Sequence, residues 1–122
     1  MSKTILTIDD SPSVRQMVSM TLTSAGYTVL EASGGAEGYD KAIATHVDAI
    51  LTDLNMPGMN GLDFIRKYRT HPSSAGIPIV FLTTESDDAL KRQAKEAGAT
   101  GWIVKPFKQD QLVAIVKKVA GQ

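Results

Sequence analysis

Apolar residues are distributed along this chain in two alternating patterns. Short runs are apolar at consecutive positions, which is typical of strands that are covered on both faces of a parallel sheet. Between them lie longer segments in which apolar residues recur every third or fourth position, as on one face of a helix. The short runs predict strands at residues 5–8, 28–30, 49–52, 77–82 and 102–104.

The longer segments predict helices at residues 14–22, 36–43, 62–68, 90–97 and 112–119. Residues that begin and end helices agree with these positions. Pro12 follows Ser11, and proline is favoured in the first turn of a helix. Gly26 and Gly98 stand where the first and fourth helices should end. Strands alternating with helices predict an α/β fold, here a flavodoxin-like doubly wound sandwich with a five-stranded parallel sheet of order 2-1-3-4-5 and five helices.

Polar residues stand at the carboxyl ends of the predicted strands. In an open α/β sheet the binding site lies beyond these ends, near the point where the strand order reverses. The fold should therefore gather carboxylates, a hydroxyl group and an ammonium group at one edge of the sheet. The residues are Asp9 and Asp10 after the first strand, Asp53 and Asn55 after the third, Thr83 and Thr84 after the fourth, and Lys105 after the fifth.

The chemistry of this set indicates a site for Mg²⁺ and a phosphoryl group. Carboxylates held close together repel one another, and a bound cation is a usual reason to keep them. Mg²⁺ binds one or two carboxylates with waters and phosphate oxygens. Asp10 and Asp53 would supply these carboxylates, and the backbone carbonyl of Asn55 a further ligand. Lys105 and Thr83 offer a charge and a hydroxyl donor to phosphoryl oxygens, and an aspartate can itself form an aspartyl phosphate.

Each residue also has a purely structural interpretation. The acids after the first strand are typical helix caps, as is Thr83 before the fourth helix. Asp53 precedes a Pro-Gly pair and would open a turn. Lys105 would be a solvated surface lysine. Several independent strand ends would, however, have to carry matching chemistry by chance, which favours a common site.

Length and composition narrow the class of protein. A chain of 122 residues fits one domain, residues 1–122. Its 13 basic and 13 acidic side chains balance, so nothing indicates binding to nucleic acid or to a membrane. It has no cysteine, which excludes thiolate chemistry. It also lacks a signal-peptide layout and an apolar run of membrane-spanning length. We therefore expect a monomeric protein of the cytoplasm.

Four motifs follow one another along the chain near the ends of the predicted strands. They are Ile8-Asp9-Asp10-Ser11, the segment from Asp53 to Leu62, Phe81-Leu82-Thr83-Thr84 and Val104-Lys105-Pro106-Phe107. Each alone is a moderate signal, and the ordered set is a strong one. Over its whole length the chain resembles the receiver domains of two-component response regulators. Within that family it is similar to the single-domain chemotaxis regulators of the CheY type.

The resemblance implies the roles of the residues around the site. Asp53 matches the phospho-acceptor, which a histidine kinase phosphorylates in a Mg²⁺-dependent reaction. Asp10 matches the direct metal ligand, and Asp9 matches an acid that acts chiefly through water. Asn55 matches the position whose backbone carbonyl binds the metal. Lys105 matches the phosphate-binding lysine, whose bond to the following proline is cis in this family.

Further positions match residues that transmit or time the signal. Thr83 matches the switch hydroxyl, and Trp102 stands at the switch aromatic position, where Tyr or Phe is more common. Asn55 and Glu85 match the chemotaxis type, at positions whose side chains influence the water that hydrolyses the phosphoryl group. Thr84 stands where a small residue such as alanine is frequent, so its bulk should affect access to that group.

Two other functions use similar residues. Phosphatases of the haloacid-dehalogenase type also combine a nucleophilic aspartate with a lysine, a hydroxyl residue and acids that bind Mg²⁺. They carry an acid two residues after the nucleophile, however, where this chain has Asn55. A nucleotide- or flavin-binding module would need a phosphate-cradling loop after the first strand, where this chain has the glycine-free segment Asp10-Ser11-Pro12-Ser13.

The resemblance also implies how the domain would signal. It would assist only its own phosphorylation and dephosphorylation, so it would be a regulator and not an enzyme. Its output would be phosphorylation-dependent binding to a target, such as a flagellar motor switch component, or it would serve only as a phosphate sink. The binding surface would comprise the fourth helix, fifth strand and fifth helix, around Lys91, Arg92, Trp102 and Lys108.

Overall fold

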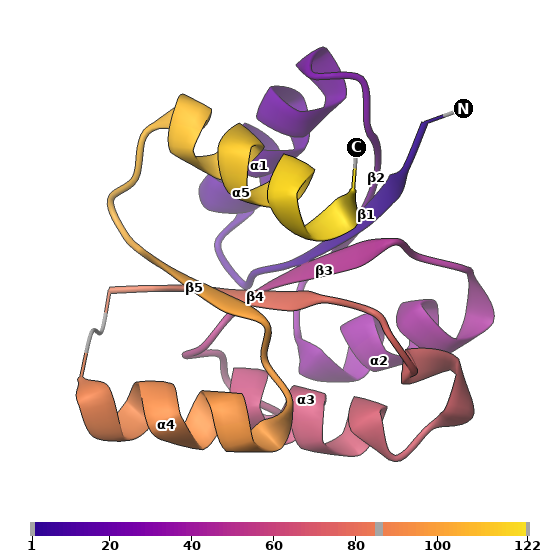
Figure 1. Cartoon of the computed structure of the whole chain (residues 1–122), viewed down its shortest axis with the longest axis vertical. Coiled ribbons are helices and arrows are strands. Elements are labelled where there is room, and N and C mark those ends of the chain that lie inside the picture. Colours follow the sequence, from indigo (N-terminus) through magenta and orange to yellow (C-terminus); the bar gives the residue numbers. More distant parts are fainter. Residues whose placement is uncertain (1, 85–86, 122) are drawn as a thin grey trace.

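A parallel sheet lies between two layers of helices in the computed structural model, which describes residues 2–84 and 87–121 (Figure 1). The five strands have the order β2-β1-β3-β4-β5, which confirms the predicted topology. Their bounds are β1 (Thr4–Ile8), β2 (Thr28–Ala32), β3 (Ala49–Asp53), β4 (Ile79–Thr83) and β5 (Gly101–Val104).

The helices cover both faces of the sheet. They are α1 (Pro12–Ser24), α2 (Gly35–Ala44), α3 (Gly61–Arg69), α4 (Asp88–Ala97) and α5 (Gln109–Ala120), with a short 3₁₀ turn at Pro72–Ser74. Helices α1 and α5 pack on one face and α2, α3 and α4 on the other (Figure 1). Within the described ranges, no helix combines the length and apolarity needed to cross a membrane.

Successive residues of the central strands supply the two cores. Ile5 and Leu51 face α1 and α5, whereas Leu6 and Ile50 face the other layer. All four side chains are fully buried. Burial of both faces explains why these strands are apolar at consecutive positions and not alternately polar.

The predicted boundaries of two strands need correction. The fourth strand begins at Ile79 and not at residue 77, because Pro78 has no N–H to donate to a neighbouring strand. The carbonyl of Pro78 still accepts a hydrogen bond from the Ile50 N–H at 2.9 Å. The second strand continues past residue 30 to Ala32, since Glu31 and Ala32 remain paired with β1 despite the polar side chain of Glu31.

The helix caps are residues other than the candidate site residues. The Ser11 hydroxyl accepts a hydrogen bond from the Val14 N–H and caps α1. Asp87 caps α4, where its carboxylate accepts from the N–H groups of Ala89 and Leu90. The capping role considered for the acids after β1 and for Thr83 is therefore wrong.

Candidate functional site

Three carboxylates meet at the carboxyl edge of the sheet. Asp9 follows β1 and Asp53 ends β3, and these adjacent strands are in register with Ile8 beside Thr52. Asp9, Asp10 and Asp53 each place a carboxylate oxygen within 4.8 Å of the others. The structure thus brings together the acids that the sequence analysis assigned to one site.

Asp9 is held rigidly among these acids. Its side chain is 2% exposed, and its Oδ1 accepts a hydrogen bond of 2.9 Å from the Ser11 N–H. Its own N–H donates to the carbonyl of Ala32 at 3.1 Å, which ties it to the end of β2. Hydrogen bonds thus hold both the carboxylate and the backbone of Asp9 in place within the site.

Asp10 has the opposite surroundings. It is exposed, and its carboxylate forms no hydrogen bond or ion pair with any residue in the ranges 2–84 and 87–121. Its oxygens are therefore available to a cation from solvent, as a direct ligand requires.

Lys105 reaches the acids from the end of β5. Its Nζ lies 3.2 Å from Oδ2 of Asp9 and 3.5 Å from Oδ1 of Asp53. Its N–H donates to the carbonyl of Thr83 at 2.7 Å, and the Lys105–Pro106 peptide is cis, as the resemblance implied. The ammonium group therefore contacts the carboxylates of both Asp9 and Asp53.

The environment of Asp53 makes its ionised form costly. Burial of the side chain raises the pKa of Asp53, the Lys105 ammonium lowers it in part, and the nearby Asp9 carboxylate raises it again. One lysine thus does not fully offset the cost of burying this charge beside a second carboxylate. A divalent cation bound to the same oxygens would remove that deficit.

The donor set fits Mg²⁺. Carboxylate oxygens are its preferred ligands, and it commonly uses one or two of them together with water and phosphate oxygens. Here one acid is exposed and unpaired, and another, Asp53, is partly open to solvent, with 12% of its side chain exposed. Asn55 is exposed two residues beyond Asp53, at the position expected to offer its carbonyl.

A close backbone approach beside Asp53 was not found from the sequence. A Cβ on Gly61 would lie 2.5 Å from the carbonyl oxygen of Asp53 and 2.6 Å from the ring of Phe81. Gly61 opens α3 after Asn60, which caps the helix reciprocally with Asp63. The sequence signal for this approach was the glycine in the motif that follows Asp53. A glycine is needed there because α3 packs directly on the end of β3.

Of the remaining predicted residues, two lie on β4 and β5 and one lies outside the described ranges. Thr83 is 1% exposed and ends β4, next to β3. Trp102 is half-buried in β5, and its ring meets that of Phe81 edge-on with centroids 5.7 Å apart. Glu85 lies outside the described residues.

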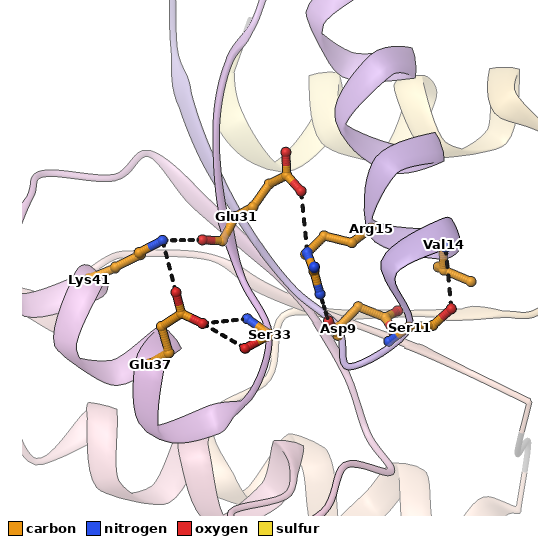
Figure 2. A network of polar contacts seen from close by, with 8 residues as sticks. All are labelled: Asp9, Ser11, Val14, Arg15, Glu31, Ser33, Glu37 and Lys41. Carbon is orange, nitrogen blue, oxygen red and sulfur yellow. Dashed lines mark hydrogen bonds and ion pairs between the residues drawn. The ribbon is translucent and has the colours of Figure 1, made fainter.

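Sequence reasoning also missed the arginine that holds the acid-bearing loop. Arg15 of α1 donates from Nη1 to the carbonyl of Asp9 at 2.6 Å, and its Nε lies 3.3 Å from Oε1 of Glu31 (Figure 2). The available signal was the position of Arg15, which lies six residues after Asp9 and one turn into the first helix.

The comparison with known families agrees with this geometry. The response regulator receiver domain matches residues 5–117 of the chain. The chain therefore belongs to the receiver domains of response regulators.

Its relatives include regulators of different overall length. It is 40% identical to the chemotaxis protein CheY1 of Helicobacter pylori over 119 residues, which covers 96% of both chains. It is 36% identical to the phosphate regulon regulator PhoB of Pseudomonas aeruginosa, of which it spans only 51%. Among solved structures, the chemotaxis protein CheY4 of Vibrio cholerae superposes with a TM-score of 0.95 at 42% identity, covering 98% of this chain and 99% of that one.

Proposed function

We propose that this receiver domain accepts a phosphoryl group on Asp53 from the phosphohistidine of a histidine kinase, in a reaction that requires Mg²⁺. The observation that carries the proposal is the position of the Asp53 carboxylate, within 4.8 Å of two further carboxylates and 3.5 Å from the Lys105 ammonium. An oxygen in this position lies close both to a positive charge and to carboxylates that can bind a cation. Phosphoryl transfer asks mainly for such positioning and charge neutralisation.

The proposed transfer exchanges one phosphorus bond for another. A carboxylate oxygen of Asp53 attacks the phosphorus, an O–P bond forms, and the N–P bond of the phosphohistidine breaks with its electron pair staying on the imidazole. Bound Mg²⁺ would neutralise charge on the phosphoryl oxygens. Lys105 holds a further phosphoryl oxygen, and Asp9 stays hydrogen-bonded beneath the site. In hydrolysis, water attacks the phosphorus, the O–P bond to Asp53 breaks, and inorganic phosphate leaves, which returns Asp53 as a free carboxylate.

The second part of the proposal concerns the output, which we place on the surface of α4, β5 and α5. Trp102 lines a groove of about 240 Å³ on its α4 side and one of about 550 Å³ on its α5 side. Lys91 lines the first groove with Trp102, and Arg92 of α4 and Lys108 before α5 are also exposed, which suits a target with acidic side chains. Similarity to the chemotaxis protein CheY1 over nearly the whole chain supports a role in chemotaxis. The target that the family resemblance implies is a motor switch component in the cytoplasm.

Labelling with acetyl phosphate tests the acceptor. Asp53→Asn should abolish incorporation, because an amide is a poor nucleophile. Asp40→Asn is the matched control, since Asp40 is an exposed aspartate on α2, and it should label at the wild-type rate. A variant Asp53→Asn that still forms a base-labile phosphoprotein at that rate would show that another residue is the acceptor.

Fluorescence of Trp102 tests the coupling to the output surface. It is the one tryptophan of the sequence. Beryllofluoride with Mg²⁺ should change its emission or its quenching by acrylamide in the wild type. The change should be much smaller in Thr83→Ala, and Thr83→Ser should restore it because the hydroxyl donor is kept. A wild-type signal that stays constant at saturating beryllofluoride removes Trp102 from the switch.

A further inference from the structure

A chain of polar contacts leads from the outer strand of the sheet to the acid-bearing loop (Figure 2). Arg15 lies at its centre, with 19% of its side chain exposed. One end of its guanidinium donates to the backbone carbonyl of Asp9 at 2.6 Å, and the other end faces Glu31 at 3.3 Å. A planar guanidinium can hold two such partners in a fixed relation, which a lysine cannot.

The carbonyl that Arg15 holds belongs to the peptide that joins the two acids of the loop. The orientation of this peptide sets the direction in which Asp10 leaves the backbone. The carboxylate of Asp10 makes no hydrogen bond or ion pair of its own in the described ranges, and it would be repelled by the other acids of the cluster. Its position therefore depends on the backbone to which it is attached.

Glu31 gives the arginine a second partner, on the edge strand of the sheet. Its strand position is paired with Thr7 of β1, and its carbonyl accepts a hydrogen bond from Lys41 of α2. Lys41 also forms an ion pair of 3.1 Å with Glu37, one turn earlier on the same helix. The contact between Arg15 and Glu31 thus links α1 to the edge strand of the sheet and, through Lys41, to α2.

The ion pair also limits what Arg15 contributes as a charge. Its guanidinium faces the carboxylate of Glu31, which offsets much of its field at the acids. Exposed ion pairs of this kind contribute little to stability by themselves, and 45% of the Glu31 side chain is exposed. The contact with the Asp9 carbonyl is therefore the feature of Arg15 that bears on the site.

We propose that Arg15, anchored by Glu31, is a positioning residue for the divalent cation: it holds the Asp9–Asp10 peptide so that the Asp10 carboxylate stays directed at the site. The inference rests on the proposed function, since it concerns the Mg²⁺ that phosphoryl transfer requires. It predicts that Arg15 strengthens cation binding although it is itself a cation.

The sign of the effect separates positioning from charge. If Arg15 acted through its charge, Arg15→Gln would bind Mg²⁺ more tightly, because a positive group near the cation is removed. Positioning predicts the opposite, with Mg²⁺ affinity about tenfold weaker, as for other residues that orient metal ligands. Titration calorimetry with Mg²⁺ alone measures this without any phosphodonor. Lys117→Gln is the control, since it removes one exposed positive charge from outside this network and leaves the contact with the Asp9 carbonyl in place, and its affinity should equal that of the wild type or exceed it.

Two further variants test the mechanism. Arg15→Lys keeps the charge but not the two-pronged contact, so it should also weaken Mg²⁺ binding. Glu31→Ala should weaken it in the same direction but less, and adding Glu31→Ala to Arg15→Gln should cause no further loss, because both changes release the same contact.

The outcomes distinguish this inference from the function on which it rests. Unchanged or tighter Mg²⁺ binding in Arg15→Gln overturns the positioning role, while Asp53 labelling in the wild type would leave the phospho-acceptor role standing. A wild type that binds no Mg²⁺ overturns both. Thermal melts in chelator identify any variant that has lost its fold, and in that case Arg15→Lys and Glu31→Ala decide the question.

Discussion

Two aspartates at opposite ends of β3 have opposite electrostatic surroundings. Asp48 directly precedes the strand, and its Oδ2 accepts a hydrogen bond of 2.8 Å from the Thr4 N–H. This hydrogen bond is the main reason that the pKa of Asp48 is lowered. Asp53 ends the same strand, and burial together with the Asp9 carboxylate raises its pKa in spite of Lys105. One carboxylate is stabilised as an anion by the fold, whereas the other is an anion that the fold alone does not satisfy.

The comparison separates charges that hold the fold from charges that await a ligand. At the amino edge of the sheet, Arg69 is a cation whose charged group is also held by hydrogen bonds to the fold. Its guanidinium donates to the carbonyls of Ser74 at 2.6 Å, Ile77 at 2.7 Å and Gly98 at 2.8 Å. These contacts join α3, the segment before β4 and the end of α4. These structural charges are thus held by several hydrogen bonds, whereas at the site burial disfavours the charge of Asp53, and Asp10 forms no hydrogen bond or ion pair with another described residue.

Removing Arg69 should have the largest effect on stability. Arg69→Met would leave three carbonyls without their donor, so we expect a loss of about 3 kcal/mol in the free energy of unfolding. Arg66→Met on the same helix is the control, because Arg66 is exposed, and it should cost less than about 0.5 kcal/mol. Urea unfolding measures both. Equal losses in the two variants would contradict the assignment of Arg69 as a structural clamp.

The two ends of β3 should respond to neutralisation with opposite signs. In chelator at neutral pH, Asp48→Asn weakens a charge-assisted hydrogen bond and should destabilise the protein by about 1 kcal/mol. Asp53→Asn removes a buried, repelled anion and should stabilise it by an amount on the order of 1 kcal/mol. Mg²⁺ should destabilise neither variant, and it should raise the stability of the wild type relative to Asp53→Asn. If Asp53→Asn instead destabilises the protein in chelator, the Asp53 anion is not a charge that the fold leaves unsatisfied.

The pH dependence of the unfolding free energy should show the same contrast between Asp48 and Asp53 as a smaller effect. Because the folded-state pKa of Asp53 is raised, this residue gains stability as pH falls through that pKa, so the advantage of Asp53→Asn should shrink first on acidification. The folded-state pKa of Asp48 is lowered, so its contribution is present above the unfolded pKa of about 3.9 and is lost as pH falls through the folded value. Unfolding free energies of both variants and the wild type, measured between about pH 7 and pH 3, give the order in which the two stability differences disappear. The predicted order would be contradicted if, on acidification, the stability difference between Asp48→Asn and the wild type disappeared at a higher pH than the difference for Asp53→Asn.

Periodicity was sufficient to predict the elements and their order. Buried strands such as β3 are continuous apolar runs, and the parallel topology follows from strands that alternate with helices. The same reasoning placed the acids and Lys105 at one edge, because the strand ends were correct within about two residues. It failed at Pro78, where the absent N–H moved the start of β4, and it did not predict the 3₁₀ turn at Pro72–Ser74, which has no apolar period to detect.

The sequence by itself determined the fold class, the sheet order and the set of chemical groups at the carboxyl edge, because each depends on local pattern and on the geometry of parallel sheets. Tertiary structure decided which of those groups are satisfied. Asp9 is braced by Ser11 and Lys105, while Asp10 is left exposed, although the two are neighbours in the chain. Burial, and contacts between residues far apart in sequence such as Asp9 and Lys105, set these differences, and no local pattern encodes them.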